Sequence, residues 1–181
     1  MNKTILILGG SSSIAREIVK LHQEDDVYFS YHSTLENVEN AFYLDLYDLE
    51  SYNNIPSKKY DIIYSFLGYT PNVDLIEDLE TSKATIELNF LYPTLILQFL
   101  LQKQYVQNES SIKIVTSVAG VRGRKLNYIY GASKSGVQRL IEGLAHKYTH
   151  IKFTDIVLGP VYTESVPIHK TPSFLISQPT I

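Results

Sequence analysis

The stretch that decides the fold is Thr4-Ile-Leu-Ile-Leu-Gly-Gly-Ser-Ser-Ser-Ile-Ala15. It starts as a short apolar run, passes through two glycines and three serines, and continues into a helical pattern in which Ile14, Ile18 and Leu21 share one face. We therefore predict a strand, a tight turn and a helix. The main-chain N–H groups at such a helix start are suited to hold a phosphate.

The same alternation of apolar run and helical stretch continues along the chain. The further apolar runs are Val27–Ser30, Ile62–Leu67, Ile112–Thr116 and Phe153–Leu158, with a shorter one at Ala41–Leu44, and helical stretches lie near 46–54, 74–103 and 131–148. Continuously apolar strands that alternate with helices indicate a parallel sheet covered on both faces. We predict an α/β fold with a doubly wound parallel sheet, in a single domain over residues 1–181.

Charge, hydropathy and the lack of cysteine exclude several classes of partner and site. The 181 residues carry a net charge of −3 with no basic run, so a nucleic-acid partner is not expected. Polar residues and a proline interrupt the most apolar segment, Ile86–Leu101, so we expect no membrane span. The absence of cysteine excludes disulfides, thiolate metal sites and a cysteine nucleophile, and fits a cytoplasmic protein.

Tyr130 and Lys134 have the spacing that places a phenol and an ammonium on one face of a helix. A second pair, Tyr148 and Lys152, has the same spacing, and each tyrosine has a serine 13 residues upstream. Context favours the first pair, because its serine, Ser117, follows an apolar strand. The residues between its members, Gly131-Ala-Ser133, are small enough to let a ligand approach. The second pair straddles a helix end and a strand start, so it cannot share a helical face.

The ordered set of these features resembles the short-chain dehydrogenase/reductase family of the Rossmann-fold superfamily, from Lys3 to about Thr163. The matching segments are the glycine turn, Asp45-Leu46, Asp61–Gly68, Asn89, Ser117–Gly120, Tyr130 with Lys134, and Leu158–Thr163. The resemblance implies an oxidoreductase that transfers a hydride between a nicotinamide and a carbonyl or alcohol substrate.

The expected catalytic residues are Asn89, Ser117, Tyr130 and Lys134. A phenol needs its pKa lowered to act as a base near neutrality, and an ammonium about 4 Å away supplies roughly the required free energy. We expect Lys134 to lower the pKa of Tyr130, and Ser117 to hydrogen-bond the substrate oxygen. Pro93 lacks an N–H and so leaves the Asn89 carbonyl without its helical partner. The resemblance implies that a water bound there relays protons to Lys134.

The resemblance places the cofactor at the carboxyl ends of the strands. The expected cofactor-binding residues are Gly9, Ser11, Ser12, Ser13, Ile14, His32, Ser33, Asp45, Leu46, Gly68, Tyr130, Lys134, Gly159, Val161 and Thr163. Tyr31–Thr34 carries no carboxylate that could hold the ribose of NAD(H), so we expect NADP(H), with NAD(H) as the alternative.

The sequence departs from the family pattern in three places. Ser13 and Ala15 stand where glycines are usual, and Ser65-Phe-Leu-Gly68 replaces Asn-Asn-Ala-Gly. Relatives continue through a further helix and strand. We therefore expect a fold that lacks both, leaves Phe153–Leu158 at the sheet edge, and keeps only part of a substrate lid in residues 159–181.

Two other functions remain open: a dinucleotide-binding or sensing protein without turnover, and a relative of the nucleotide-sugar epimerases and dehydratases. We interpret Glu142, His146 and His150 as solvated charges near a helix end and expect no metal site. By the resemblance, the helices over Leu88–Tyr105 and after Tyr130 pair across a two-fold axis, which implies a homodimer or homotetramer.

Overall fold

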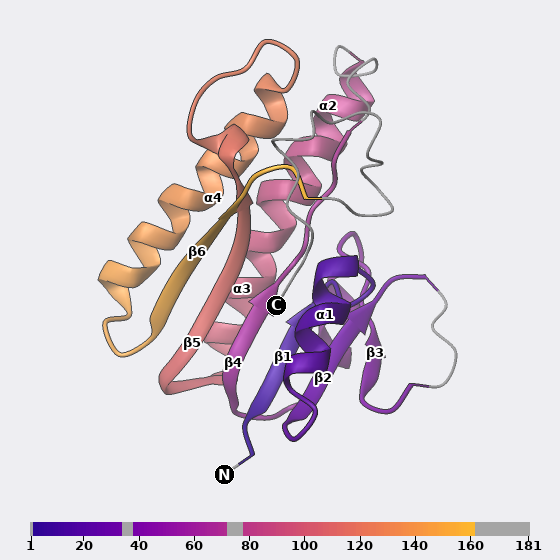
Figure 1. Cartoon of the computed structure of the whole chain (residues 1–181), viewed down its shortest axis with the longest axis vertical. Helices are drawn as coiled ribbons and strands as arrows, with labels where there is room; N and C mark the ends of the chain where they lie inside the picture. The colour runs from indigo at the N-terminus through magenta and orange to yellow at the C-terminus, as the bar shows by residue number, and fades with distance from the viewer. Residues whose placement is uncertain (1, 34–37, 72–77, 162–181) are drawn as a thin grey trace.

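Six parallel strands form the centre of the computed structural model, which describes residues 2–33, 38–71 and 78–161 (Figure 1). The strands are β1 (Thr4–Leu8), β2 (Asp26–Tyr31), β3 (Ala41–Tyr43), β4 (Tyr60–Ser65), β5 (Val106–Ser117) and β6 (Lys152–Leu158). Their order in the sheet is β3-β2-β1-β4-β5-β6, and every neighbouring pair is parallel. The order reverses between β1 and β4, which confirms the doubly wound class.

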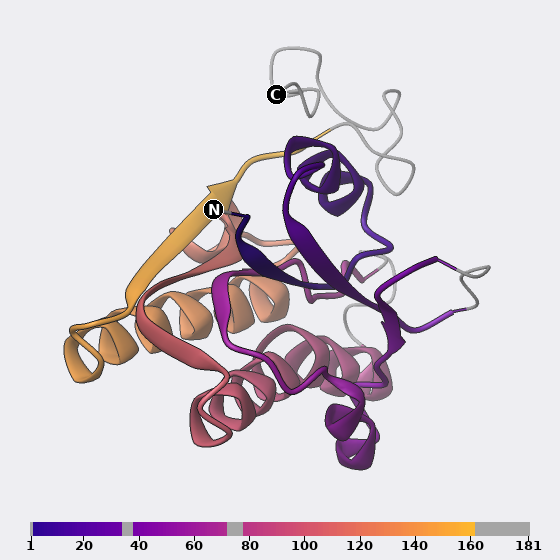
Figure 2. The ribbon, with the colours of Figure 1, turned by 90° about the horizontal axis from the view of Figure 1, so that it is seen from below.

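Helices cover the sheet on both faces, as Figure 2 shows. One face carries α1 (Ser13–Leu21), and the other carries α3 (Tyr92–Gln102) and α4 (Tyr128–Lys147). The β1 side chains Ile5 to Leu8 are all fully buried, because both faces of this central strand are covered. Successive side chains point to opposite faces, so Leu6 and Leu8 join the core under α3 and α4, while Ile5 and Ile7 pack with Ala15 of α1.

The long apolar helical region divides into three segments. Helix α2 (Leu79–Ile86) leads into a π-helical turn, η3 (Glu87–Leu91), and then into α3. By length and composition, the stretch Leu79–Gln102 would suffice to cross a membrane, although polar residues interrupt it. Ile96, Leu97 and Leu100 are buried in the core cluster that includes the sheet, so α3 packs one face against the sheet.

Two predicted elements have different bounds in the structure. The helix expected near 46–54 is a short 3-10 helix, η1 (Leu49–Asn54), because the Asp48 side chain accepts a hydrogen bond from Glu50 N and starts the helix only there. Strand β5 begins at Val106, six residues before the apolar run. Its first part is polar and irregular, and Ser110 Oγ ties it to Tyr60 O at 2.7 Å, a contact that no apolar pattern encodes.

Strand β6 lies at the edge of the sheet and pairs only with β5 within the described residues. Val157 of β6 is 42% exposed. This agrees with the expectation of an edge strand at Phe153–Leu158. Most of the expected lid segment, including Thr163, lies outside the described residues.

Candidate active site

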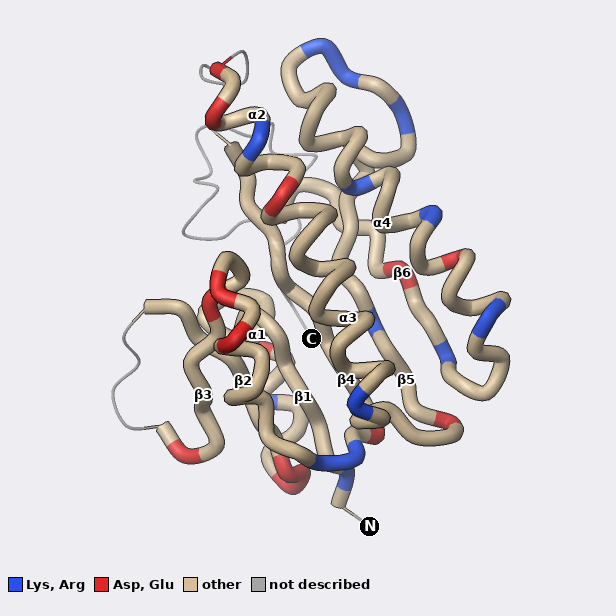
Figure 3. The backbone as a smooth tube through the Cα atoms, turned by 180° about the vertical axis from the view of Figure 1, so that it is seen from behind, with Lys and Arg blue, Asp and Glu red and all other residues tan. Residues whose placement is uncertain are grey.

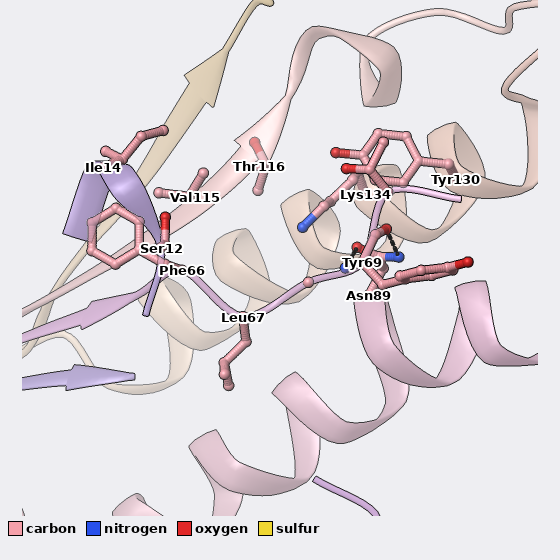
Figure 4. A pocket seen from close by; sticks show the side chains of 12 residues that line it. Ser12, Ile14, Phe66, Leu67, Tyr69, Asn89, Val115, Thr116, Tyr130 and Lys134 are labelled. Atoms are coloured by element: carbon pink, nitrogen blue, oxygen red, sulfur yellow. Dashed lines mark hydrogen bonds between the residues drawn. The ribbon is translucent and has the colours of Figure 1, made fainter. Parts of the chain in front are cut away.

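A pocket opens at the carboxyl edge of the sheet, where the strand order reverses (Figure 4). It runs from the start of α1 to the start of α4 and is lined by Ser12, Ile14, Phe66, Leu67, Gly68, Tyr69, Thr70, Asn89, Val115, Thr116, Tyr130 and Lys134. Six of these residues were expected from the sequence: Ser12, Ile14, Gly68, Asn89, Tyr130 and Lys134. The fold therefore brings the glycine turn and the tyrosine–lysine pair to one cavity.

The glycine turn is held by its own backbone. Gly9 has a φ of +81°, and its N–H donates to Ser30 Oγ at 2.8 Å. Gly10 N donates to Ser30 O at 2.9 Å, and a Cβ on Gly10 would lie 2.9 Å from Phe29. The two glycines thus give the turn its shape, and their N–H groups are already engaged. The N–H groups left for a ligand are those that follow, at the start of α1.

The start of α1 suits an anion. Ser12 is the N-cap residue, and its side chain makes no capping hydrogen bond. Ser13 and Ile14 form the first turn of α1, where main-chain N–H groups have no partner within the helix. Ser13 and Ala15, which stand where the family usually has glycines, do not close this end, since Ser12 and Ile14 line the pocket.

Tyr130 lies in the first turn of α4, beside the end of β5. The side chains of Ser117 and Thr70 lie near its hydroxyl, and both act to lower the pKa of Tyr130. Ser117 Oγ also accepts from Ala119 N at 3.1 Å, which caps the short 3-10 helix η4 (Val118–Gly120) and fixes the serine. The predicted convergence of Ser117 and Tyr130 is thus present in the structure. Thr70 was not expected, because nothing in the loop sequence marks its hydroxyl as facing Tyr130.

The expected effect of Lys134 on Tyr130 is wrong for this structure. Burial raises the pKa of Tyr130 above its usual value of 10.0, and the hydrogen bonds from Ser117 and Thr70 oppose this only in part. Lys134 Nζ lies 5.8 Å from the centroid of the tyrosine ring. Burial is the largest influence on the pKa of Tyr130, and Lys134 is not among the groups that lower it.

Lys134 is itself deeply buried, with 5% of its surface exposed. Burial lowers the pKa of Lys134 to about 8, and the carboxylate of Asp155 opposes the shift. A Cβ on Gly68 would lie 2.9 Å from Lys134 Nζ, so only glycine leaves room for the ammonium there. Asp155 was missed by the sequence reasoning, although a carboxylate inside the apolar run Phe153–Leu158 is a usable signal.

Asn89 acts in the structure through its side chain. It is fully buried, its Nδ2 donates to Tyr69 O at 2.7 Å and to Thr85 O at 2.9 Å, and its Oδ1 accepts from Tyr69 N at 3.1 Å. The amide thus clamps the loop that carries Thr70. At Asn89 the helix widens into the π-helical turn, in which Tyr92 N donates to Glu87 O.

The residues expected around the adenosine half of the cofactor lie at the ends of β2 and β3. His32 Nε2 is 3.8 Å from Asp45 Oδ1, and the imidazole stacks on Tyr43 at 6.1 Å between ring centroids. Ser33, next to His32 in the chain, is exposed. Ser11, in the glycine turn, is also exposed. Leu46 instead packs against the main core, so it contributes mainly to packing.

The remaining expected residues fall on several elements. Gly159 follows β6 with open space where a Cβ would stand, and Val161 is the last described residue. Not every small residue after Tyr130 serves to admit a ligand. A Cβ on Gly131 would lie 2.6 Å from Ala119 O, so this glycine permits α4 to pack on η4.

The rejected pair and the histidine stripe lie away from the pocket. Tyr148 is the C-cap of α4 and Lys152 begins β6, so they share no helical face. Glu142 pairs with Arg139 at 2.6 Å, and His146 lies in the last turn of α4. The described part of the chain contains no group of three or more acidic, histidine or cysteine residues that could hold a metal ion.

Comparison with known proteins gives the family. The family model described as short chain dehydrogenase matches residues 61–171. Uncharacterised oxidoreductases from two strains of Mycobacterium tuberculosis are 29% identical over 68 residues, which cover 38% of this chain and 27% of each relative. The matched segment is thus a minor part of those relatives.

Solved structures agree on the fold. A short chain dehydrogenase family protein from Francisella tularensis has a TM-score of 0.81 at 19% identity, covering 99% of this chain and 87% of that chain. BdcA, solved in complex with NADPH, has a TM-score of 0.78 at 23% identity, covering 98% of this chain and 82% of that chain. With the family model matched over more than half of its length, the chain belongs to the short-chain dehydrogenase/reductase family of oxidoreductases.

Proposed function

We propose that this protein reduces a carbonyl group on a small organic or sugar-like molecule with a nicotinamide cofactor, and that Tyr130 is the proton donor. The observation that carries the proposal is that Tyr130 and Lys134 line one end of a pocket whose other end is the start of α1, with Ser117 near the Tyr130 hydroxyl. Family membership supports the class of reaction.

The residues present fit a dinucleotide. The start of α1, with Ser12, Ser13 and Ile14, would hold the pyrophosphate, and His32 with Ser33 would lie toward the adenosine. The turn keeps its backbone close to β2 because Gly10 has no Cβ. When bound, the cofactor supplies the hydride.

The side chains supply the proton chemistry. The Tyr130 phenol would donate its proton to the carbonyl oxygen; burial raises its pKa, and the hydroxyls of Ser117 and Thr70 lower it toward the range that proton transfer needs. Ser117 can hydrogen-bond the substrate oxygen on which negative charge develops. Lys134, with its pKa near 8, is able to lose or gain a proton at working pH and so to reprotonate the phenol.

We infer a preference for NADP(H) over NAD(H). The residues after β2, Tyr31 to Ser33, carry no carboxylate that would repel a 2′-phosphate, and BdcA was solved with NADPH. Asp45 lies 3.8 Å from His32 and is the acidic group that works against this preference. We also propose a homodimer or homotetramer, since Leu91 of η3, within the region expected to pair across the two-fold axis, is exposed.

The test has two stages. NADPH and NADH are first titrated against the fluorescence of the 14 tyrosines, and the tighter cofactor is then used with a panel of carbonyl compounds. We expect tighter binding of NADPH and turnover of at least one compound. Cofactor binding without any turnover would instead favour the dinucleotide sensor, and a reduced-nicotinamide absorbance band that copurifies with the protein would favour the epimerase-like relative.

A further inference from the structure

The loop between η4 and α4 is the most basic stretch of the surface. Residues 121–127 read Val-Arg-Gly-Arg-Lys-Leu-Asn, so Arg122, Arg124 and Lys125 fall within four positions of a chain whose net charge is −3. All three are exposed. Figure 3 shows this loop as blue segments with no red between them, at the end of the molecule where α4 begins.

These cations have no anionic partner in the described parts of the chain. The four ion pairs within residues 2–33, 38–71 and 78–161 involve other side chains, and none includes Arg122, Arg124 or Lys125. Like charges so close together repel one another, and the repulsion is relieved when an anion binds between them.

The loop is anchored to the active site at both ends. It leaves the 3-10 helix that Ser117 caps, with Val121 N donating to Val118 O, and it returns into the helix of Tyr130, with Gly131 N donating to Asn127 O at 2.8 Å. Arg124 stands six positions before Tyr130, so their Cα atoms lie at most about 20 Å apart. A substrate held at Tyr130 can therefore reach the cations.

Exposed apolar side chains accompany the cations. Val121 is 68% exposed, Leu126 is 61% exposed and Tyr128 is 49% exposed. Large apolar groups at the rim of a pocket are the usual contact surface for the uncharged part of a ligand. The loop thus offers exposed apolar side chains together with a concentration of positive charge, in the segment that leads into Tyr130, which lines the pocket.

We propose that residues 121–128 bind the anionic end of the substrate: a carbonyl compound with a phosphate or carboxylate on an arm of about 10–20 Å. This inference rests on the proposed function and adds the class of substrate. Nucleic acid is a poorer fit, because the basic stretch is one short loop on an acidic protein.

A matched pair of ketones tests the inference. Acetoacetyl-coenzyme A carries phosphates on a long arm, and acetoacetyl-N-acetylcysteamine has the same reacting group without them. Their dissociation constants are measured by calorimetry with and without NADP⁺, which cannot reduce a ketone. We expect the coenzyme A ester to bind at least about tenfold more tightly. The advantage should shrink as salt is raised from about 0.05 M to about 0.5 M.

Variants locate the charge. The loop variant Arg122→Gln/Arg124→Gln/Lys125→Gln should lose about tenfold in affinity for the coenzyme A ester and little for the neutral ester. Its control, Lys20→Gln/Lys103→Gln/Lys147→Gln, removes the same charge from exposed residues at the carboxyl ends of α1, α3 and α4, away from the pocket.

Equal binding of the two esters, no binding of the coenzyme A ester, or equal losses in both variants would overturn the inference. Reduction of the neutral ester with no preference for the charged one would leave the proposed function intact. Conversely, a protein that binds no nicotinamide cofactor would overturn the proposed function, while binding of the esters in the absence of cofactor would still decide the role of the loop.

Discussion

The two ends of the pocket are built in different ways. At the glycine turn, position is set by main-chain hydrogen bonds to Ser30 and by the absence of a Cβ on Gly10. At the other end, the half-buried Tyr130 and the buried Lys134 carry the chemistry, and desolvation shifts the pKa values of both. The shape of the turn therefore depends on how small its residues are, whereas the chemistry at the other end depends on which functional groups are present.

This difference explains which departures from the family pattern the protein tolerates. Serine at position 13 changes little, because the main chain donates to a phosphate whatever the side chain. Ser65 and Phe66 replace amides at the end of β4, and Phe66 and Leu67 line the pocket with apolar groups. There the Asn89 side chain supplies the polar contacts to the loop, through Tyr69.

The largest effect is expected at the catalytic end. Tyr130→Phe removes the proton donor without changing the ring, so turnover should fall about a thousandfold, whereas the dissociation constant of NADPH should change little. Steady-state kinetics and cofactor titration measure the two effects. Retention of more than a tenth of the activity would show that Tyr130 is not the donor and that the two ends do not differ as described.

The next effect is on stability as a function of pH. Because the pKa of Lys134 falls from 10.5 to about 8 on folding, the unfolded chain binds more protons between these pH values, and stability should rise with pH across that window. The gain is on the order of 3 kcal/mol. Lys134→Met should abolish this slope and make the protein more stable at pH 7 but inactive. Urea unfolding at several pH values measures the unfolding free energy of the wild type and of Lys134→Met. The same dependence on pH in both proteins would contradict the burial of a charged lysine.

At the glycine turn, size should matter most. Gly10→Val places a side chain 2.9 Å from Phe29 and 3.0 Å from Ser30 O, so we expect a loss of about 2 kcal/mol in unfolding free energy together with weaker cofactor binding. Ser11→Val adds the same side chain at an exposed neighbour and serves as the control for stability. Similar unfolding midpoints for Gly10→Val and Ser11→Val would contradict the inference that steric contact with Phe29 excludes a side chain at position 10.

The smallest effect concerns the residue that the sequence did not reveal. Thr70→Val removes one hydrogen bond to Tyr130, so the pKa of Tyr130 should rise further and turnover should fall about threefold. Thr70→Ser keeps the hydroxyl and should retain wild-type turnover. Equal rates in all three proteins, from pH–rate profiles, would show that Thr70 has no part in setting the proton affinity of Tyr130.

Much of the fold could be predicted because its signal is local. Ile5 to Leu8 form a buried strand since they are apolar in succession, and Gly9 and Gly10 mark the turn because few other residues fit there. The bounds of β5 could not be predicted, because Ser110 joins the strand through a hydrogen bond to Tyr60, 50 residues earlier in the chain.

The sequence by itself determined the order of strands and helices along the chain, the position of the glycine turn, and the placement of Tyr130 and Lys134 on one helix. These features depend on residue type and short spacings. Only the tertiary structure decided the burial that raises the pKa of Tyr130, the influence of Asp155 on Lys134 and the clamp of Asn89 on Tyr69. The physical reason is that desolvation and electrostatic interactions depend on distances between segments far apart in the chain, and periodicity within one segment carries no information about those distances.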